Sequence, residues 1–235
     1  MDKRNLKFLV LNIIFALSLH ANMEINTPDG CRLEFIQKIN SKSAPILIEI
    51  HGLGSTKEEW RKFNLYLDKE KINYIAIDLR GHGKSINCNN KEIKYPNLSK
   101  KDIKNFIIDI DTVYKKAKEN FNDKQIIPIG ASIGANLITK YFYKKAKKMI
   151  LLSPGLNYGG YEIAEYIKKA NSKILFSTSL TDIYSYDSVR IFIQISQSTG
   201  KKWDLILAQK GHGVQIFDQP DGEDYIKRII EWLKK

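Results

Sequence analysis

The chain has 235 residues, of which 43% are hydrophobic, and a formal net charge of +12. This length and apolar content fit one globular domain, and no internal repeat or low-complexity tract is present. The lysines are scattered and accompany no recognisable nucleic-acid-binding module, so we expect no nucleic-acid partner and only weak attraction to an anionic membrane surface at low salt.

The first residues differ in character from the rest of the chain. Basic residues precede a mainly apolar run over residues 8–19, which has the length of a signal-peptide core and is short for a membrane-spanning helix. We therefore predict that residues 1–21 are a signal peptide cleaved after Ala21 and that the protein is exported, to the periplasm or beyond the cell. Leu19 departs from the small residue that cleavage favours, which leaves an uncleaved membrane anchor or a buried strand as alternatives.

The remaining residues, 22–235, are predicted to form one domain of alternating strands and helices. Residues 23–27 and 32–37 alternate apolar and polar side chains around the turn sequence Pro28-Asp29-Gly30, which predicts an antiparallel hairpin. Apolar runs predict buried strands at 46–50, 74–77, 125–129, 149–152, 174–177 and 205–207. Helices are expected over 57–68, from Ser99 to Ala117 behind a capping box, over 135–142, over 188–197 and at the carboxyl end, and the polar stretch up to Asn97 is expected to be a loop.

This alternation predicts an α/β fold with a mostly parallel central sheet, the antiparallel hairpin at its N-terminal edge and helices on both faces. Functional sites in such sheets form beyond the carboxyl ends of the strands. Five polar residues lie in the segments beyond the carboxyl ends of predicted strands, and these are His51, Asp78, Ser132, Asp182 and His212. The sequence therefore predicts a site at this edge of the sheet.

Two cysteines, Cys31 and Cys88, are compatible with export but do not require it. They either form a disulfide or lie apart as small buried hydrophobic residues. Sequence alone cannot decide, because it does not place the two Cα atoms.

Ser132 lies in Gly130-Ala131-Ser132-Ile133-Gly134, between a predicted strand and a predicted helix. A tight strand-to-helix turn needs small neighbours and holds the serine in a strained, exposed conformation, which is the context of a nucleophile elbow. A serine needs a histidine to take its proton and a carboxylate to orient the histidine. His212, between two glycines, and Asp182 supply these groups in the chain order Ser, Asp, His that this type of fold uses.

Asp187 lies in the same region as Asp182 and is the reserve candidate for the acid. The backbone N–H groups of Leu53 and Ile133 are the candidate oxyanion donors, because one lies in a glycine loop after a strand and the other begins a helix. His51, Asp78, Arg80 and His82 are interpreted as residues that organise their loops, because the triad is already complete.

The chain resembles the α/β-hydrolase superfamily over roughly residues 24–235. The motifs that carry the resemblance are His51-Gly52-Leu53-Gly54, Asp78-Leu79-Arg80-Gly81-His82-Gly83-Lys84-Ser85, Gly130-Ala131-Ser132-Ile133-Gly134, Asp182 and Gly211-His212-Gly213. Ser179 stands where many relatives carry glycine, three residues before the acid. The stretch Ser153-Pro154-Gly155-Leu156-Asn157-Tyr158 is similar to one in small, often exported bacterial members.

The resemblance implies a short lid over residues 155–172, because members with large caps insert a helical domain at this point. A short lid implies a shallow pocket, for which Tyr158 and Tyr161 are the candidate lining residues. The expected function is a serine hydrolase that cleaves carboxylic esters of a small-molecule or acylated substrate. A thioesterase or peptidase with the same triad and a non-catalytic binding protein of the same fold are the alternatives. We expect no cofactor and no metal, because no cluster has ligand spacing, and the sequence does not determine the oligomeric state.

Overall fold

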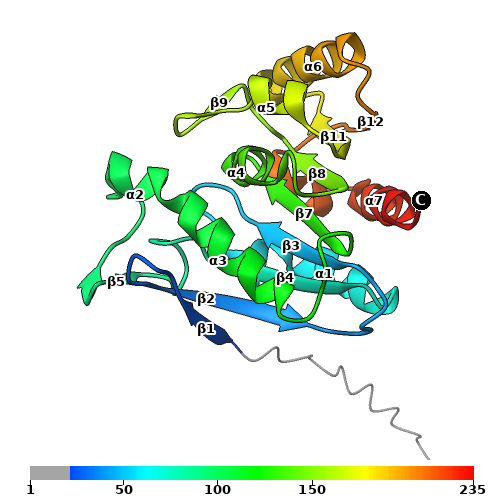
Figure 1. The fold of residues 1–235 in the computed structure, drawn as a ribbon. Helices are drawn as coiled ribbons and strands as arrows, with labels where there is room; N and C mark the ends of the chain where they lie inside the picture. Colours follow the sequence, from blue (N-terminus) through cyan, green and yellow to red (C-terminus); the bar gives the residue numbers. More distant parts are fainter. Residues whose placement is uncertain (1–21) are drawn as a thin grey trace, which may run out of the picture.

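The protein is described by a computed structural model over residues 22–235, which form a central sheet with helices on both faces (Figure 1). The segment predicted as a signal peptide or anchor, residues 1–21, lies outside the described residues. The elements in chain order are β1 Met23–Asn26, β2 Cys31–Lys38, β3 Ile46–Ile50, the 3₁₀ helix η1 Lys57–Trp60, α1 Arg61–Lys69, β4 Asn73–Ile77, β5 Asn87–Cys88, β6 Lys91–Glu92, α2 Lys100–Lys104, α3 Phe106–Lys118, β7 Ile126–Ala131, α4 Ile133–Phe142, β8 Lys148–Leu152, β9 Asn157–Tyr158, β10 Tyr161–Glu162, α5 Ala164–Lys169, β11 Lys173–Ser179, α6 Ile183–Ser198, β12 Trp203–Ala208, the 3₁₀ helix η2 Gly213–Asp218 and α7 Gly222–Lys234.

The central sheet has the strand order β12-β11-β8-β7-β3-β4-β2, with β1 and the short β5 and β6 attached beyond β4 through β2. The strands from β12 to β4 are parallel to their neighbours, whereas β2 runs antiparallel to β4 and to β1. The predicted fold class, with its antiparallel N-terminal hairpin, is thereby confirmed. The parallel strands place their carboxyl ends at one edge of the sheet, where polar residues follow them.

Two hydrophobic layers lie on the two faces of this sheet. In β3, which is buried throughout, Ile46, Ile48 and Ile50 join the layer under α3, α4, α5 and α6, and Leu47 joins the layer under α1, η2 and α7. This burial on both faces explains why the parallel strands read as nearly continuous apolar runs. None of the helices over residues 22–235 combines the length and apolar character that crossing a bilayer requires.

The region between β4 and β7 differs from the sequence prediction in two ways. The capping box at Ser99 is present, but the helix it begins ends at Lys104, and a second helix starts at Phe106. The hydroxyl of Tyr161 donates to the carbonyl oxygens of Ile103 and Lys104, so a distant side chain satisfies backbone acceptors where the helix is interrupted. The expected loop before Ser99 contains β5 and β6, which extend the sheet beside β2.

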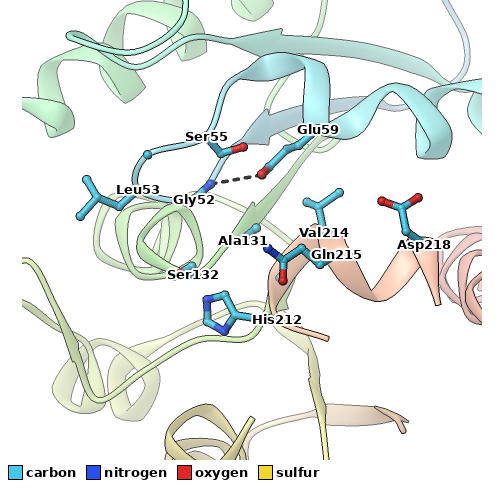
Figure 2. Close-up of a pocket in the computed structure, with 12 residues that line it drawn as sticks. Gly52, Leu53, Ser55, Glu59, Ala131, Ser132, His212, Val214, Gln215 and Asp218 are labelled. Carbon is cyan, nitrogen blue, oxygen red and sulfur yellow. Dashed lines mark hydrogen bonds between the residues drawn. The ribbon is translucent and has the colours of Figure 1, made fainter. Parts of the chain in front are cut away.

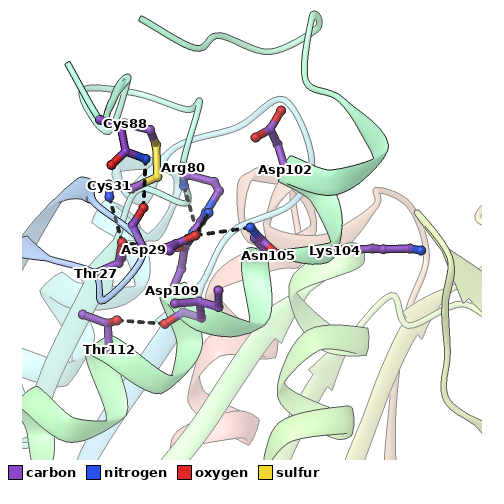
Figure 3. Close-up of polar contacts among 12 residues, drawn as sticks. Thr27, Asp29, Cys31, Arg80, Cys88, Asp102, Lys104, Asn105, Asp109 and Thr112 are labelled. Carbon is purple, nitrogen blue, oxygen red and sulfur yellow. Dashed lines mark hydrogen bonds and ion pairs between the residues drawn. A yellow bond between two sulfur atoms is a disulfide. The ribbon is translucent and has the colours of Figure 1, made fainter. Parts of the chain in front are cut away.

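Covalent and ionic links attach the N-terminal hairpin to this region (Figure 3). Cys31 and Cys88 form a disulfide between β2 and β5, which decides between the two alternatives for the cysteines. The buried guanidinium of Arg80 pairs with Asp109 on α3 at 2.7 Å and with Asp29 in the hairpin turn at 2.6 Å. Since a buried charge needs such partners, these contacts fix the loop that follows β4.

Candidate active site

Ser132 lies at the sharp turn between β7 and α4. Its backbone has φ 55° and ψ −121°, in a positive-φ region that is unfavourable for a residue with a side chain. The neighbouring glycines explain why the turn can close, because a Cβ at Gly130 would meet the backbone of Gly134 at 2.4 Å and one at Gly134 would meet the carbonyl oxygen of Ile50 at 2.3 Å. The turn therefore has the geometry of the predicted nucleophile elbow.

His212 and Asp182 lie together beyond the ends of β12 and β11. The Nδ1 of His212 is 2.7 Å from Oδ2 of Asp182. Burial raises the pKa of Asp182, but hydrogen bonds from His212 and Ser153 outweigh this effect and hold it below its ordinary value. Because an ionised carboxylate only accepts, Nδ1 carries the proton and Nε2 is left as the acceptor. The side chain of His212 is 39% exposed.

A cavity of about 360 Å³ lies between Ser132, His212 and the glycine loop after β3 (Figure 2). Its lining residues are Gly52, Leu53, Gly54, Ser55, Glu59, Ala131, Ser132, His212, Gly213, Val214, Gln215 and Asp218. Ser132 and His212 thus line the same cavity, although no hydrogen bond joins the serine hydroxyl to the imidazole among the hydrogen bonds of the described residues. Such contacts are often long in ligand-free enzymes and shorten when substrate is present.

Two backbone N–H groups lie free around Ser132. Gly52 donates to Glu59 at 3.1 Å and Gly54 donates to Nε2 of His82 at 3.0 Å, while the N–H of Leu53 between them has no acceptor in the part of the chain that the structure describes. Ile133 is the first residue of α4, so its N–H has no partner within the helix. These are the two groups that the sequence predicted as oxyanion donors.

Glu59 is a feature of the cavity that sequence reasoning missed. It lies in η1, and burial raises the pKa of its carboxyl to about 7, against the lowering effects of hydrogen bonds from Ser55 and Gly52. With Asp218 it contributes two carboxyl groups to a cavity whose lining contains no lysine or arginine. No signal in the sequence could identify Glu59, because a glutamate at the start of a helix is common and stabilises that end without any functional role.

The early loop residues organise the backbone around the cavity, as the sequence predicted. Nε2 of His51 accepts the N–H of Leu79 at 2.9 Å, and burial lowers the pKa of this histidine to about 4. Asp78 accepts from the backbone N–H and the ammonium group of Lys57, both at 2.7 Å. His82 holds the glycine loop through Gly54.

Tyr158 and Tyr161 occupy different environments. The ring of Tyr158 contacts that of His212 edge-on, with centroids 6.2 Å apart, and its hydroxyl interacts with Ser132. Burial raises the pKa of Tyr158, so the phenol stays protonated. Neither tyrosine is among the residues that line the cavity, and Tyr161 is only 4% exposed. Its hydroxyl is directed to the α2 carbonyls, so Tyr161 packs the β9–β10 hairpin and does not form the pocket wall that the sequence suggested.

The reserve acid lies elsewhere. Asp187 is on α6, where its carboxylate pairs with Arg190 at 3.6 Å, and His212 is hydrogen-bonded to Asp182 instead.

Over residues 22–235 no group of three or more histidine, cysteine or acidic side chains is arranged to hold a metal ion.

The fold and this arrangement define an α/β hydrolase. The chain belongs to the family described as serine aminopeptidase, S33, whose sequence model matches residues 41–189. This family lies within the superfamily that the sequence motifs indicated, so the resemblance is confirmed.

Solved structures agree on the fold. An esterase of Pyrococcus furiosus, Pf2001, superposes with a TM-score of 0.74 at 21% identity, covering 92% of this chain and 89% of the other. The esterase EaEST of Exiguobacterium antarcticum has a TM-score of 0.71 at 13% identity, covering 92% and 100%. A thioesterase domain from the curacin biosynthetic pathway has a TM-score of 0.67 at 14% identity, covering 92% and 99%. No curated protein matches the sequence.

Proposed function

We propose that the protein is a serine hydrolase that cleaves carboxylic esters through an acyl-enzyme. Ser132 is the nucleophile, His212 the general base and acid, and Asp182 the group that orients the imidazole. The 2.7 Å contact between His212 and Asp182, on the wall of the cavity that contains the strained serine, carries this proposal. Each partner alone has an ordinary structural explanation, but a non-catalytic binding protein would not need all three together.

The reaction follows from these positions. Nε2 of His212 takes the proton of Ser132 as the oxygen attacks the acyl carbon, and the N–H groups of Leu53 and Ile133 donate to the oxygen that becomes negative. The imidazolium then gives its proton to the departing alkoxide, which leaves an acyl-serine. Water, deprotonated by the same histidine, releases the carboxylic acid and restores the enzyme.

A second candidate function is the hydrolysis of amides next to a free amino group. Two carboxyl groups without a basic residue in the cavity lining favour a substrate that carries a positive charge, as does the aminopeptidase description of the family. Thioesters are cleaved by the same chemistry. Paired p-nitrophenyl esters, with and without an α-amino group, together with an aminoacyl p-nitroanilide and an acyl thioester, separate these substrate classes by kcat/KM.

The nucleophile is tested by labelling with a fluorophosphonate. The probe should modify Ser132 in the wild-type protein, and Ser132→Ala should abolish labelling and lower kcat on the order of 10⁶-fold, as expected for loss of a serine nucleophile. A folded Ser132→Ala protein that is still labelled, or still turns over esters at the wild-type rate, would exclude this assignment.

We also propose that the enzyme is exported, as a periplasmic or secreted protein or held by its N-terminal segment. The Cys31–Cys88 disulfide supports this location, since such bonds persist in oxidising compartments. The net charge of +12 favours weak contact with an anionic membrane surface. Fractionation of cells, with N-terminal sequencing of the mature protein, tests both the location and the cleavage after Ala21.

A further inference from the structure

Ser153, the residue directly after β8, has an unusual backbone. Its φ is 47°, and its side chain is completely buried. The other described residues that adopt positive φ without being glycine are Lys71, Asn89, Asn90 and Ser132. Asparagine tolerates this conformation and Lys71 lies in the turn after α1, so the two serines stand out. They follow neighbouring strands, and a strained residue persists only where its surroundings hold it in place.

The contacts of Ser153 explain what holds it. Its N–H donates to the carbonyl oxygen of Ser177 on β11 at 2.7 Å. Its Oγ accepts the N–H of Gly213, the residue after His212, at 2.8 Å. The hydroxyl also lies close enough to the carboxylate of Asp182 to lower its pKa. Because the Gly213 N–H already donates to the oxygen and a carboxylate only accepts, the single hydroxyl proton points to Asp182.

Ser153 therefore touches both halves of the pair that orients the proposed base. Asp182 is the residue before α6 and His212 is the residue before η2, and these segments follow different strands. The carboxylate is held from three directions, by the imidazole, by the N–H of Ser185 at 3.4 Å and by the Ser153 hydroxyl. The backbone after the histidine is held by the same hydroxyl, so one oxygen fixes the two segments relative to each other.

We propose that Ser153 is a positioning residue that aligns Asp182 and His212 for catalysis. This inference rests on the proposed serine hydrolase function. In this role Ser153 acts on the orientation of the His212 imidazole and not on the substrate, because Ser153 is not among the residues that line the cavity. Without the hydroxyl, the Gly213 N–H loses its acceptor, and the carboxylate can rotate away from Nδ1. A misplacement of about 1 Å in such an assembly costs roughly a hundredfold in rate.

The test compares Ser153→Ala with Ser172→Ala. Ser172 is also buried, and its hydroxyl donates to the carbonyl oxygen of Ala146 at 2.7 Å, before the start of β11 and away from the site. Both variants lose one buried serine hydroxyl, so both should lose similar stability. Ser153→Ala should lower kcat for a p-nitrophenyl ester roughly tenfold to a hundredfold with little change in KM, and Ser172→Ala should not.

A second variant separates strain from hydrogen bonding. Ser153→Gly relieves the positive φ but also removes the hydroxyl, so it should fold at least as well as Ser153→Ala and show the same loss of kcat. The low-field ¹H NMR resonance of the His212 Nδ1 proton, which does not depend on turnover, should shift or broaden in both variants and stay unchanged in Ser172→Ala.

The labelling and kinetic results distinguish a failure of this inference from a failure of the proposed function. If the fluorophosphonate does not label Ser132 in the wild-type protein, the hydrolase proposal fails first. If it labels Ser132 and the Ser153 variants keep the wild-type kcat and the wild-type Nδ1 resonance, the positioning role is refuted while the hydrolase proposal stands. A loss of kcat confined to the Ser153 variants, with the changed resonance, supports it.

Discussion

Glu49 lies in the middle of β3 with its carboxyl group completely buried. Neither of its oxygens has a hydrogen-bond partner among the described residues, and the same holds for the side-chain amide of Asn64 beside it. Burial raises the pKa of Glu49 well above its ordinary value of 4.5, and the nearby amide lowers it only in part. A charged carboxylate in this position would be far more costly than a neutral acid. We therefore predict that Glu49 is protonated in the folded protein.

The sign of the pH dependence follows from linkage. The folded-state pKa is higher than the unfolded-state pKa, so the stability associated with neutral Glu49 is fully present below about pH 4.5 and is lost as the pH rises towards the folded-state pKa. One proton corresponds to roughly 1.4 kcal/mol of the unfolding free energy for each pH unit in that interval. Glu49→Gln removes the titration and keeps the shape of the side chain.

The measurement is urea unfolding at pH 5, 6 and 7, followed by the fluorescence of the three tryptophans. The difference in unfolding free energy between Glu49→Gln and wild type should move in favour of the variant by about 1.4 kcal/mol per pH unit. Contributions from other groups, such as Asp109, whose pKa is raised to about 6 by burial, cancel in this difference. Glu231→Gln, at an exposed position on α7, is the control. Parallel curves for Glu49→Gln and wild type would refute a protonated Glu49.

Three further predictions concern charge, cross-linking and backbone space. Because burial raises the pKa of Glu59 to about 7, its carboxyl is charged mainly above that pH. Glu59→Gln should therefore lower kcat/KM for a cationic ester relative to a neutral ester at pH 8 but not at pH 5, and an unchanged ratio at pH 8 would contradict this influence. The Cys31–Cys88 bridge closes a loop with a separation of 57 residues, for which chain entropy gives about 4 kcal/mol. The double serine variant should lose up to this stability in urea unfolding, and dithiothreitol should weaken only the wild type; equal stability of both proteins without reductant would contradict it. Gly134→Ala brings a Cβ to 2.3 Å from a backbone oxygen of β3 and should cost more than about 2 kcal/mol. Gly200→Ala meets open space and should cost about 1 kcal/mol of backbone strain, so equal unfolding free energies for the two glycine variants would argue against the steric reason.

The sequence was sufficient for the fold because the parallel strands are buried on both faces. The run 149–152 is apolar without interruption and the run 46–50 is interrupted only by Glu49, and this pattern indicates strands covered by helices on each side. The same alternation placed the residues after each strand at one edge of the sheet. The hydrogen bond between His212 and Asp182 lies where this reasoning expected it, although the catalytic roles remain proposals.

Features that depend on distant contacts could not be predicted in this way. The helix break at Asn105 is accompanied by the Tyr161 hydroxyl, more than fifty residues further along the chain. The short strand β5 exists because it pairs with β2, and β6 because it pairs with β5. Ser153 did carry a signal, since it directly follows a strand, but its burial and its bond to Gly213 are tertiary facts. Glu59 carried none.

The β9–β10 hairpin beside the site is attached to the body of the protein at several points. The hydroxyl of Tyr184 on α6 both accepts the N–H of Asn157 and donates to its carbonyl oxygen, each at 3.0 Å. Asn136 on α4 donates to the carbonyl oxygens of Gly155 and Tyr161. With its backbone anchored to two helices, the hairpin is held in one position beside His212, whose ring Tyr158 contacts, although none of the hairpin residues lines the cavity. The proposed hydrolase would therefore receive its substrate on a preformed surface, with no movement of this hairpin required.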